Sequence, residues 1–202
     1  MEKTLTFAGY KCQALYSKGV GGTPIVFLHG LNWTVEVWQR IKIVDALLEK
    51  KIPFLALDMP YGLKSECQPK TRDPMPNVEF ASGAVKSLFG DEAPILVGAS
   101  LGGNIALNYA AKHQVKGLFL VSPANVFKDL DLALKYSNFL FPVRVVWGSN
   151  DTVISGEEMR TLVDKLPTAK LLVYNNDAHS SYVDQPEWFK TDLLKLYVTA
   201  TI

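Results

Sequence analysis

Residues 96–111, LVGASLGGNIALNYAA, place Ser100 between two glycines, after an apolar run and before a helix-like one. Gly98 and Gly102 form a Gly-x-Ser-x-Gly pattern, and Gly103 follows directly. A strand that turns sharply into a helix needs small residues around the turn, because larger side chains would collide there. The stretch therefore predicts a tight turn that presents the Ser100 hydroxyl. The alternative is an ordinary loop that contains a serine, and the rest of the chain decides between the two.

Apolar runs alternate with helical patterns on both sides of this stretch. Short runs with the composition of buried strands occupy residues 23–30, 52–60, 93–99, 115–123, 141–148 and 169–176. Helical spacing occupies residues 35–50, 78–90, 101–113, 156–166 and 186–200, with loops predicted at 61–77 and an irregular stretch at 124–140. Alternating polar and apolar residues at 4–19 predict an N-terminal antiparallel hairpin around Gly9. This order predicts an α/β fold with a mostly parallel twisted sheet and helices on both faces.

Length and charge narrow the functional classes. The 202 residues fit one domain, which we expect to span residues 1–202. The 21 basic and 20 acidic residues leave a net charge of +1 with no basic block, so nucleic acid is not an expected partner. No run approaches the ~20 apolar residues of a membrane span. A monomer is plausible.

Two cysteines, Cys12 and Cys67, lack the spacing of a metal site. The first 17 residues carry charges and a glycine where a signal peptide needs a continuous apolar run. We therefore expect two reduced thiols and a cytoplasmic protein.

A serine hydroxyl is a weak nucleophile until a base takes its proton, and the chain has three histidines. His113 ends a helix beside a lysine and is expected to be solvated, while His29 precedes Gly30 at a strand end and is interpreted as structural. His179 follows the last predicted strand, so it is the candidate base. Parallel strands bring their carboxyl ends to one edge of the sheet, where ligands bind.

The base needs an acid that fixes its tautomer. Asp151 follows the next-to-last strand and lies between Ser100 and His179 in the chain. Asp129 is the main rival, since Asp177 and Asp184 are too near His179 in sequence to reach it comfortably from across the site.

Acyl chemistry at Ser100 also requires donors for an oxyanion. The backbone N–H groups of Leu31, after His29 and Gly30, and of Leu101, at the start of the helix that follows the serine, are the candidates.

Taken together, the segments FLHG, LDMPYGLKS, GASLGG, WGSND and AHSSYVDQPEWF resemble the α/β-hydrolase superfamily in order and spacing, over nearly the whole chain. More narrowly, the short chain and its ending resemble the small, lidless hydrolases of the CCG-interacting factor B (CIB) type. The resemblance implies that Ser100 is the nucleophile, Asp151 the acid and His179 the base, with Leu31 and Leu101 as oxyanion donors. Residues 124–140 are too short for the helical cap of most relatives, so the cap is minimal or absent.

Two positions depart from the pattern of this superfamily. Tyr61 stands where a glycine is usual in the D-x-P-G-x-G-x-S segment, and Asp177-Ala178 replaces a pair of small residues before the histidine.

The expected activity is a serine hydrolase that cleaves a small-molecule ester, thioester or small amide through an acyl-enzyme, without a metal or organic cofactor. An open site predicts a preference for short acyl groups. Candidate pocket walls, for which core packing is an equal alternative, are Trp33, Val126, Phe127, Ile154 and Tyr182. An acyltransferase or a lyase with the same triad, or a non-catalytic interaction or ligand-binding module on the same fold, are the other hypotheses.

Overall fold

A single eight-stranded sheet organises the molecule, and the computed structural model describes residues 2–202. The strand order is β1-β2-β4-β3-β5-β6-β7-β8. Strands β3 to β8 pair in parallel, whereas β2 runs antiparallel to both β1 and β4. The predicted fold class, including the N-terminal hairpin, is confirmed. The strands span Glu2–Phe7 (β1), Tyr10–Ser17 (β2), Ile25–Leu28 (β3), Phe54–Leu57 (β4), Ile95–Ala99 (β5), Gly117–Val121 (β6), Val143–Gly148 (β7) and Ala169–Tyr174 (β8).

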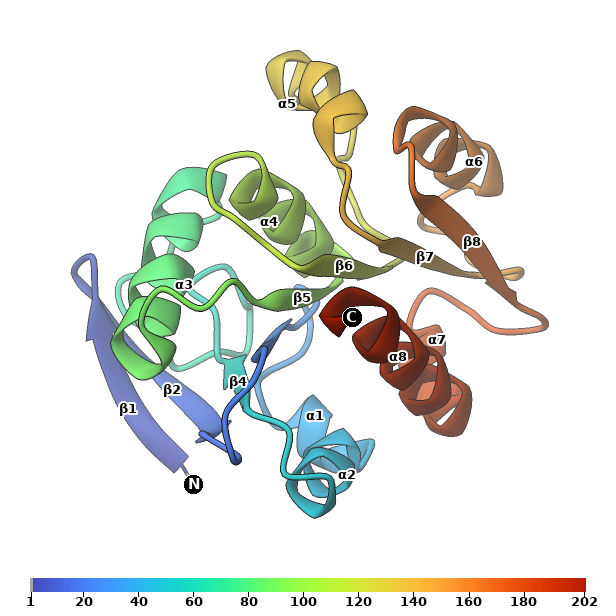
Figure 1. Ribbon diagram of the computed structural model, residues 1–202. Helices are drawn as coiled ribbons and strands as arrows, with labels where there is room; N and C mark the ends of the chain where they lie inside the picture. Colours follow the sequence, from blue (N-terminus) through green and yellow to red (C-terminus); the bar gives the residue numbers. More distant parts are fainter. Residues whose placement is uncertain (1) are drawn as a thin grey trace.

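Helices cover both faces of the sheet. Helices α3, α4, α5 and α6 lie on one face, and α1, α2, α7 and α8 lie on the other (Figure 1). The bounds are Val37–Arg40 (α1), Ile43–Glu49 (α2), Pro74–Phe89 (α3), Leu101–Ala110 (α4), Leu130–Lys135 (α5), Gly156–Lys165 (α6), Ser181–Asp184 (α7) and Pro186–Thr201 (α8), with a 3-10 turn η1 at Tyr136–Asn138. Among the described residues, no helix combines the length and the apolar composition that crossing a membrane requires.

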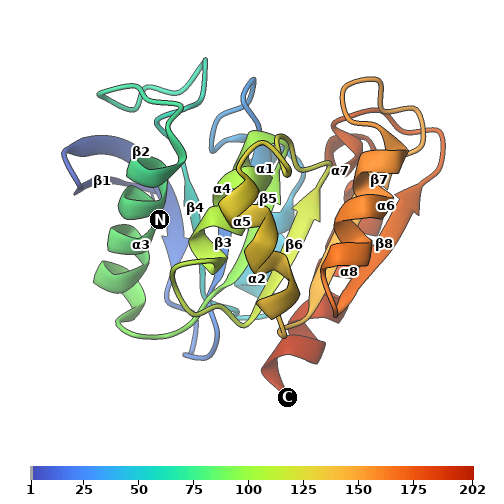
Figure 2. The same cartoon turned by 90° about the horizontal axis from the view of Figure 1, so that it is seen from above.

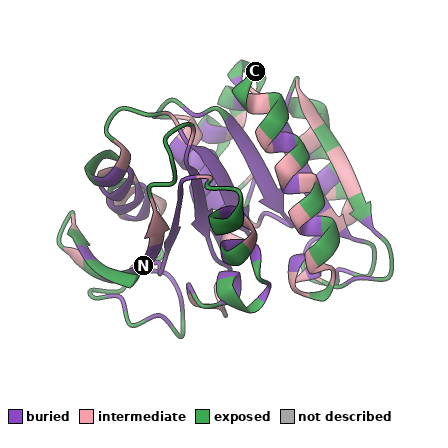
Figure 3. Ribbon diagram, turned by 60° about the horizontal axis from the view of Figure 1, so that its bottom comes forward, coloured by how far each residue is buried: buried purple, intermediate pink, exposed green. Residues whose placement is uncertain are grey.

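The central strands are buried because helices shield them on both sides. Every residue of β3, β4, β5 and β6 is buried, whereas β1 and β8 at the two edges are partly exposed (Figure 3). Continuous apolar runs in the sequence reflect this burial, since neither face of these strands meets water. Two apolar clusters result, one on each face of the sheet.

The helix predicted at residues 35–50 is interrupted. Lys42 adopts a left-handed backbone with φ +57°, and it separates α1 from α2. Ile43 is buried, whereas Leu48 is 47% exposed. Val37 and Trp38 before the break and Val44 and Leu47 after it are all buried, so the apolar face continues across the interruption although the helix does not.

Helix α3 begins earlier than predicted. Pro74 occupies its first position, and the Asp73 carboxylate accepts a hydrogen bond from the Met75 N–H. This is a capped start of the usual kind, with proline in the first turn. The helix ends at Gly90, as predicted, where φ is +68°.

Cys12 and Cys67 form a disulfide with a Cα–Cα distance of 4.3 Å, so the expectation of two reduced thiols is wrong. The cysteines meet because β2 runs beside the loop that follows β4. Lys11 and Gln68, one residue away from each cysteine, exchange two backbone hydrogen bonds of 2.7 and 3.1 Å. Reduced thiols were the reason to expect a cytoplasmic location, and the disulfide removes that reason.

The loops that follow the parallel strands gather at one edge of the sheet (Figure 2). Strands β3 and β5 are neighbours there, although the chain runs from β3 to β4 before it returns to β5. This reversal of strand order is the place where open α/β sheets bind their ligands.

Candidate functional site

Ser100 occupies the sharp turn between β5 and α4. Its backbone has φ +51° and ψ −116°, a conformation that residues with a Cβ rarely adopt. A Cβ on Gly98 would collide with the Gly102 carbonyl, and a Cβ on Gly102 would collide with the Leu28 carbonyl. Glycines are therefore required for the close approach of α4 to β5 and β3. The predicted turn is present, and its glycines have the steric role that the sequence suggests.

Hydrogen bonds hold the backbone of Ser100 on both sides. Its N–H donates to the Val121 carbonyl at 2.9 Å. Its carbonyl accepts from the N–H groups of Gly103 and Ala124, both at 3.0 Å. Because β6, the loop after it and α4 all contribute, the strained turn is determined by its surroundings.

The three side chains of the predicted triad lie in a continuous hydrogen-bonded line. His179 Nε2 is 2.9 Å from Ser100 Oγ, and His179 Nδ1 is 2.8 Å from Asp151 Oδ2. The imidazole is partly accessible, with 23% of its side chain exposed, whereas the Asp151 side chain is fully buried. This geometry matches a nucleophile, a base and an orienting acid.

Asp151 is held as a carboxylate. Its Oδ1 accepts hydrogen bonds from the N–H groups of Val153 at 2.8 Å and Ile154 at 3.0 Å. Burial alone would raise the pKa of Asp151, but the Ile154 N–H and the bond to His179 outweigh it, so the pKa lies below its usual value. An ionised Asp151 accepts a hydrogen bond from the Nδ1–H of His179, which leaves the Nε2 lone pair facing the Ser100 hydroxyl.

Close contact between two loops brings Asp151 to His179. The Asn150 N–H donates to the Asp177 carbonyl at 2.9 Å, and a Cβ on Gly148 would collide with the backbone of the same loop. The loops after β7 and β8 are thus packed against each other. This packing places Asp151, in the first loop, beside His179, in the second.

The two backbone N–H groups predicted as oxyanion donors flank the serine. Leu101 is the first residue of α4, so its N–H points out of the helix start, where the helix dipole favours negative charge. Leu31 follows Gly30, and a Cβ on Gly30 would lie 3.6 Å from Ser100 Cβ. Within residues 2–202, neither N–H donates a hydrogen bond to the protein. Both are therefore free for an acceptor on a substrate.

Within residues 2–202, the remaining candidates make no side-chain hydrogen bond to Ser100 or His179. His29 is fully buried and bonded to its surroundings, and His113 is exposed at the end of α4. The Asp129 carboxylate accepts from the Leu132 N–H at the start of α5, which makes it a helix cap. Asp177 Oδ1 accepts from Gln185 Nε2 at 3.3 Å.

A cavity of about 180 Å³ opens onto Ser100 and His179. Two of the predicted wall residues, Trp33 and Tyr182, line it. The Trp33 indole N–H donates to Ser180 Oγ at 3.3 Å, which holds the ring beside the residue that follows His179. The other lining residues are Gly30, Leu31, Asn32, Ala99, Val153 and Ser180.

The other three predicted wall residues do not line this cavity. Val126 is fully buried, and Ile154 turns into the core while its neighbour Val153 takes the place at the wall. Phe127 packs against Tyr136, with ring centroids 6.3 Å apart. These side chains belong to apolar packing, which was the alternative interpretation of each.

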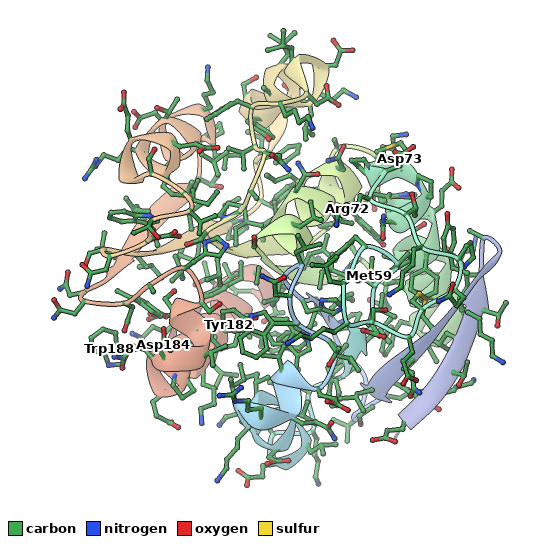
Figure 4. All side chains as sticks on the ribbon, turned by 180° about the vertical axis from the view of Figure 1, so that it is seen from behind. Met59, Arg72, Asp73, Tyr182, Asp184 and Trp188 are labelled. Carbon is green, nitrogen blue, oxygen red and sulfur yellow. A yellow bond between two sulfur atoms is a disulfide. The ribbon has the colours of Figure 1, made fainter. Side chains whose placement is uncertain are left out.

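A wider cleft of about 530 Å³ lies beside Leu101. Its wall includes Arg72 from the loop before α3, Asn104 of α4, and Lys128. Figure 4 shows Arg72 well apart from Tyr182, which comes from α7. Every residue between β6 and β7 is described, and this segment contains only the helix α5 and the turn η1. The segment borders the wider cleft and not the cavity at Ser100.

Sequence reasoning did not assign a role to Asp58 and Tyr61. Asp58 Oδ1 lies 3.1 Å from His29 Nε2, and the Tyr61 hydroxyl donates to the His29 carbonyl at 2.5 Å. The tyrosine in place of the usual glycine was the available signal for this contact.

Comparisons with known proteins agree with the fold. The model of the α/β-hydrolase fold family matches residues 23–144. The chain is 27% identical to ABHD14B of Homo sapiens, named a candidate protein-lysine deacylase, over 188 residues that cover 90% of this chain and 86% of that protein. A predicted CIB-like hydrolase from Thermoplasma acidophilum superimposes with a TM-score of 0.85 at 19% identity, covering 100% and 98% of the two chains. The esterase RhEst1 from Rhodococcus sp. ECU1013 gives 0.78 at 18% identity, covering 98% of each.

Proposed function

This chain belongs to the α/β-hydrolase fold family, and we propose that it is a serine hydrolase that cleaves a carboxylic ester, thioester or small amide through an acyl-enzyme. The observation that carries the proposal is the unbroken line from Asp151 through His179 to Ser100, with bonds of 2.8 and 2.9 Å, beside an accessible cavity. A serine that served only the fold would not need a base held in this orientation.

In the first half-reaction, the Ser100 hydroxyl attacks the carbonyl carbon while His179 Nε2 takes its proton. The carbonyl π electrons move to the oxygen, and the oxyanion accepts hydrogen bonds from the N–H groups of Leu31 and Leu101. Asp151 stabilises the imidazolium that has formed. When the oxyanion collapses, the bond to the leaving group breaks and His179 returns the proton to that group.

In the second half-reaction, water replaces the leaving group. His179 removes a proton from the water as it attacks the acyl-enzyme, and the same two N–H groups bind the new oxyanion. Collapse breaks the bond to Ser100 Oγ, which takes the proton back. The carboxylic acid leaves, and the starting state is restored.

The size of the cavity supports a preference for short acyl groups. About 180 Å³ lies below the roughly 300–1,000 Å³ of pockets that enclose drug-sized ligands. Trp33 and Tyr182 limit the cavity, and Tyr182 is almost fully buried among other aromatic rings, so it cannot move aside easily. Acetyl esters should therefore be cleaved faster than octanoyl esters. The names of similar proteins, an esterase and a candidate deacylase, are consistent with acyl chemistry.

A fluorophosphonate probe tests the proposal directly. We expect it to label the native protein and not Ser100→Ala, while Ser87→Ala, on an exposed position of α3, is labelled like the native protein. p-Nitrophenyl acetate and octanoate then report the chain-length preference. Absence of labelling in the folded protein would favour a non-catalytic binding module, and faster cleavage of the octanoate would refute the inference from cavity size.

A further inference from the structure

The turn that carries the Leu31 N–H is held by hydrogen bonds at three successive carbonyls. The His29 carbonyl accepts from the Tyr61 hydroxyl at 2.5 Å. The Gly30 carbonyl accepts from the Trp33 N–H at 3.0 Å, and the Leu31 carbonyl accepts from the Leu63 N–H at 2.9 Å. Three consecutive peptide groups are therefore fixed, although the segment belongs to neither a helix nor a strand.

The middle peptide group sets the direction of the Leu31 N–H. A peptide unit is planar, so the N–H of Leu31 lies in one plane with the Gly30 carbonyl and points the opposite way. His29 Nδ1 also approaches this carbonyl, at 2.8 Å. A carbonyl oxygen can only accept, so Nδ1 carries a proton and donates it. On the other side of the His29 ring, Nε2 accepts a hydrogen bond from the Met59 N–H at 2.9 Å, and Asp58 Oδ1 lies 3.1 Å from the same nitrogen.

The Tyr61 hydroxyl binds the preceding peptide group, between His29 and Gly30, at the start of the turn. Its side chain is buried, and burial, together with the charge of Asp58 and the nearby Tyr182, raises the pKa of its hydroxyl well above the ordinary value. The hydroxyl therefore keeps its hydrogen and remains a donor. Without it, the His29 carbonyl would lose the partner that limits rotation of the peptide group between His29 and Gly30.

We propose that Tyr61 is a positioning residue of the oxyanion hole: through the His29 carbonyl, its hydroxyl fixes the turn that aims the Leu31 N–H at the substrate oxygen. The proposal rests on the function proposed above. Tyr61 does not touch the substrate, because it acts through the backbone.

The substitution Tyr61→Phe tests the proposal, and Tyr136→Phe is its matched control. The Tyr136 hydroxyl is also buried and donates to a backbone carbonyl, that of Val126, at 2.5 Å. Each substitution removes one phenolic hydrogen bond and keeps the ring. We expect similar decreases in Tm for both variants, because the lost interactions are alike.

Catalysis should separate the two variants. For Tyr61→Phe we expect kcat with p-nitrophenyl acetate to fall about tenfold at unchanged KM, less than the 10²–10³ for complete loss of a donor, because the Leu31 N–H remains present. Affinity for a trifluoromethyl ketone, whose serine adduct carries an oxyanion, should fall by a similar factor. Tyr136→Phe should keep native values in both assays. Equal kcat for the two variants would overturn the proposal.

Amide hydrogen exchange provides a second readout that does not depend on turnover. In Tyr61→Phe, peptides that cover residues 28–33 should exchange faster than in the native protein, and in Tyr136→Phe they should not. Unchanged exchange in Tyr61→Phe would overturn the proposal even if kcat fell. If the native protein hydrolyses no ester and no probe labels Ser100, the proposed function fails, while the exchange experiment still decides whether Tyr61 holds the turn.

Discussion

Replacing Ser100 by glycine should stabilise the protein relative to replacing it by alanine. Neither variant has a hydroxyl to bond His179, so their difference isolates the backbone of the turn. At φ +51° and ψ −116°, a residue with a Cβ is strained by about 1–3 kcal/mol, and glycine is not. Glycine loses about 0.5–1 kcal/mol more conformational free energy on folding than alanine. With the middle of each range, the net advantage of Ser100→Gly is about 1 kcal/mol.

For a domain of this size, 1 kcal/mol corresponds to about 2–4 °C in Tm. Differential scanning calorimetry should therefore show Ser100→Gly melting about 2–4 °C above Ser100→Ala, with both variants inactive. If Ser100→Gly melted at the same temperature as Ser100→Ala or below it, the turn would store no strain. Glycines and surrounding hydrogen bonds would then not force Ser100 into a strained conformation.

Three further predictions concern the acid, the disulfide and the dependence of stability on pH. Asp151→Asn should lower kcat for ester hydrolysis by about 10⁴, because the amide favours the wrong tautomer of His179; retained turnover would move the acid role to another carboxylate. Cleavage of the bond between Cys12 and Cys67, 55 residues apart, by reduction or by Cys67→Ala, should lower the free energy of unfolding by about 4 kcal/mol in urea, and unchanged stability would contradict a structural disulfide. The pKa values of Asp58 and Asp151 lie below 3.8 in the folded protein, so their contribution to stability is present above pH 3.8 and is lost as the pH falls through the folded values. The urea midpoint should therefore fall with acidification below about pH 4. In Asp58→Asn it should fall less steeply, and an equal slope would show that Asp58 does not contribute to this loss of stability.

The sequence predicts the turn at Ser100 and the meeting of Ser100, Asp151 and His179 at one edge of the sheet, because steric and chemical demands both act on residue identity there. Gly98 and Gly102 can be replaced by nothing larger, and a serine nucleophile needs a histidine at the same edge of the sheet. Parallel strands bring their loops to that edge in any fold of this class. The relative positions of these side chains then follow from the strand order.

Other features depend on geometry that residue patterns do not encode. The break at Lys42 lies within a segment whose apolar spacing is that of one continuous helix. Val153 and Ile154 are adjacent apolar residues, and only the path of the loop decides which one faces the cavity. The pairing of Cys12 with Cys67 requires β2 to lie beside a distant loop, and the role of Tyr61 requires the His29 carbonyl to point toward it.

The connection between β6 and β7 has a consequence for how this protein can change its substrates. Tyr136 and Phe139 anchor the segment in the core, whereas Leu130 and Leu134 are 74% and 76% exposed. Lengthening a loop is inexpensive, since a doubling costs only about 0.6 kcal/mol in closure entropy. Additional helices inserted near Leu130 would cover the neighbouring cleft without changing the turn at Ser100. Insertions in this segment could thus change selectivity among substrates without altering Ser100, Asp151 or His179.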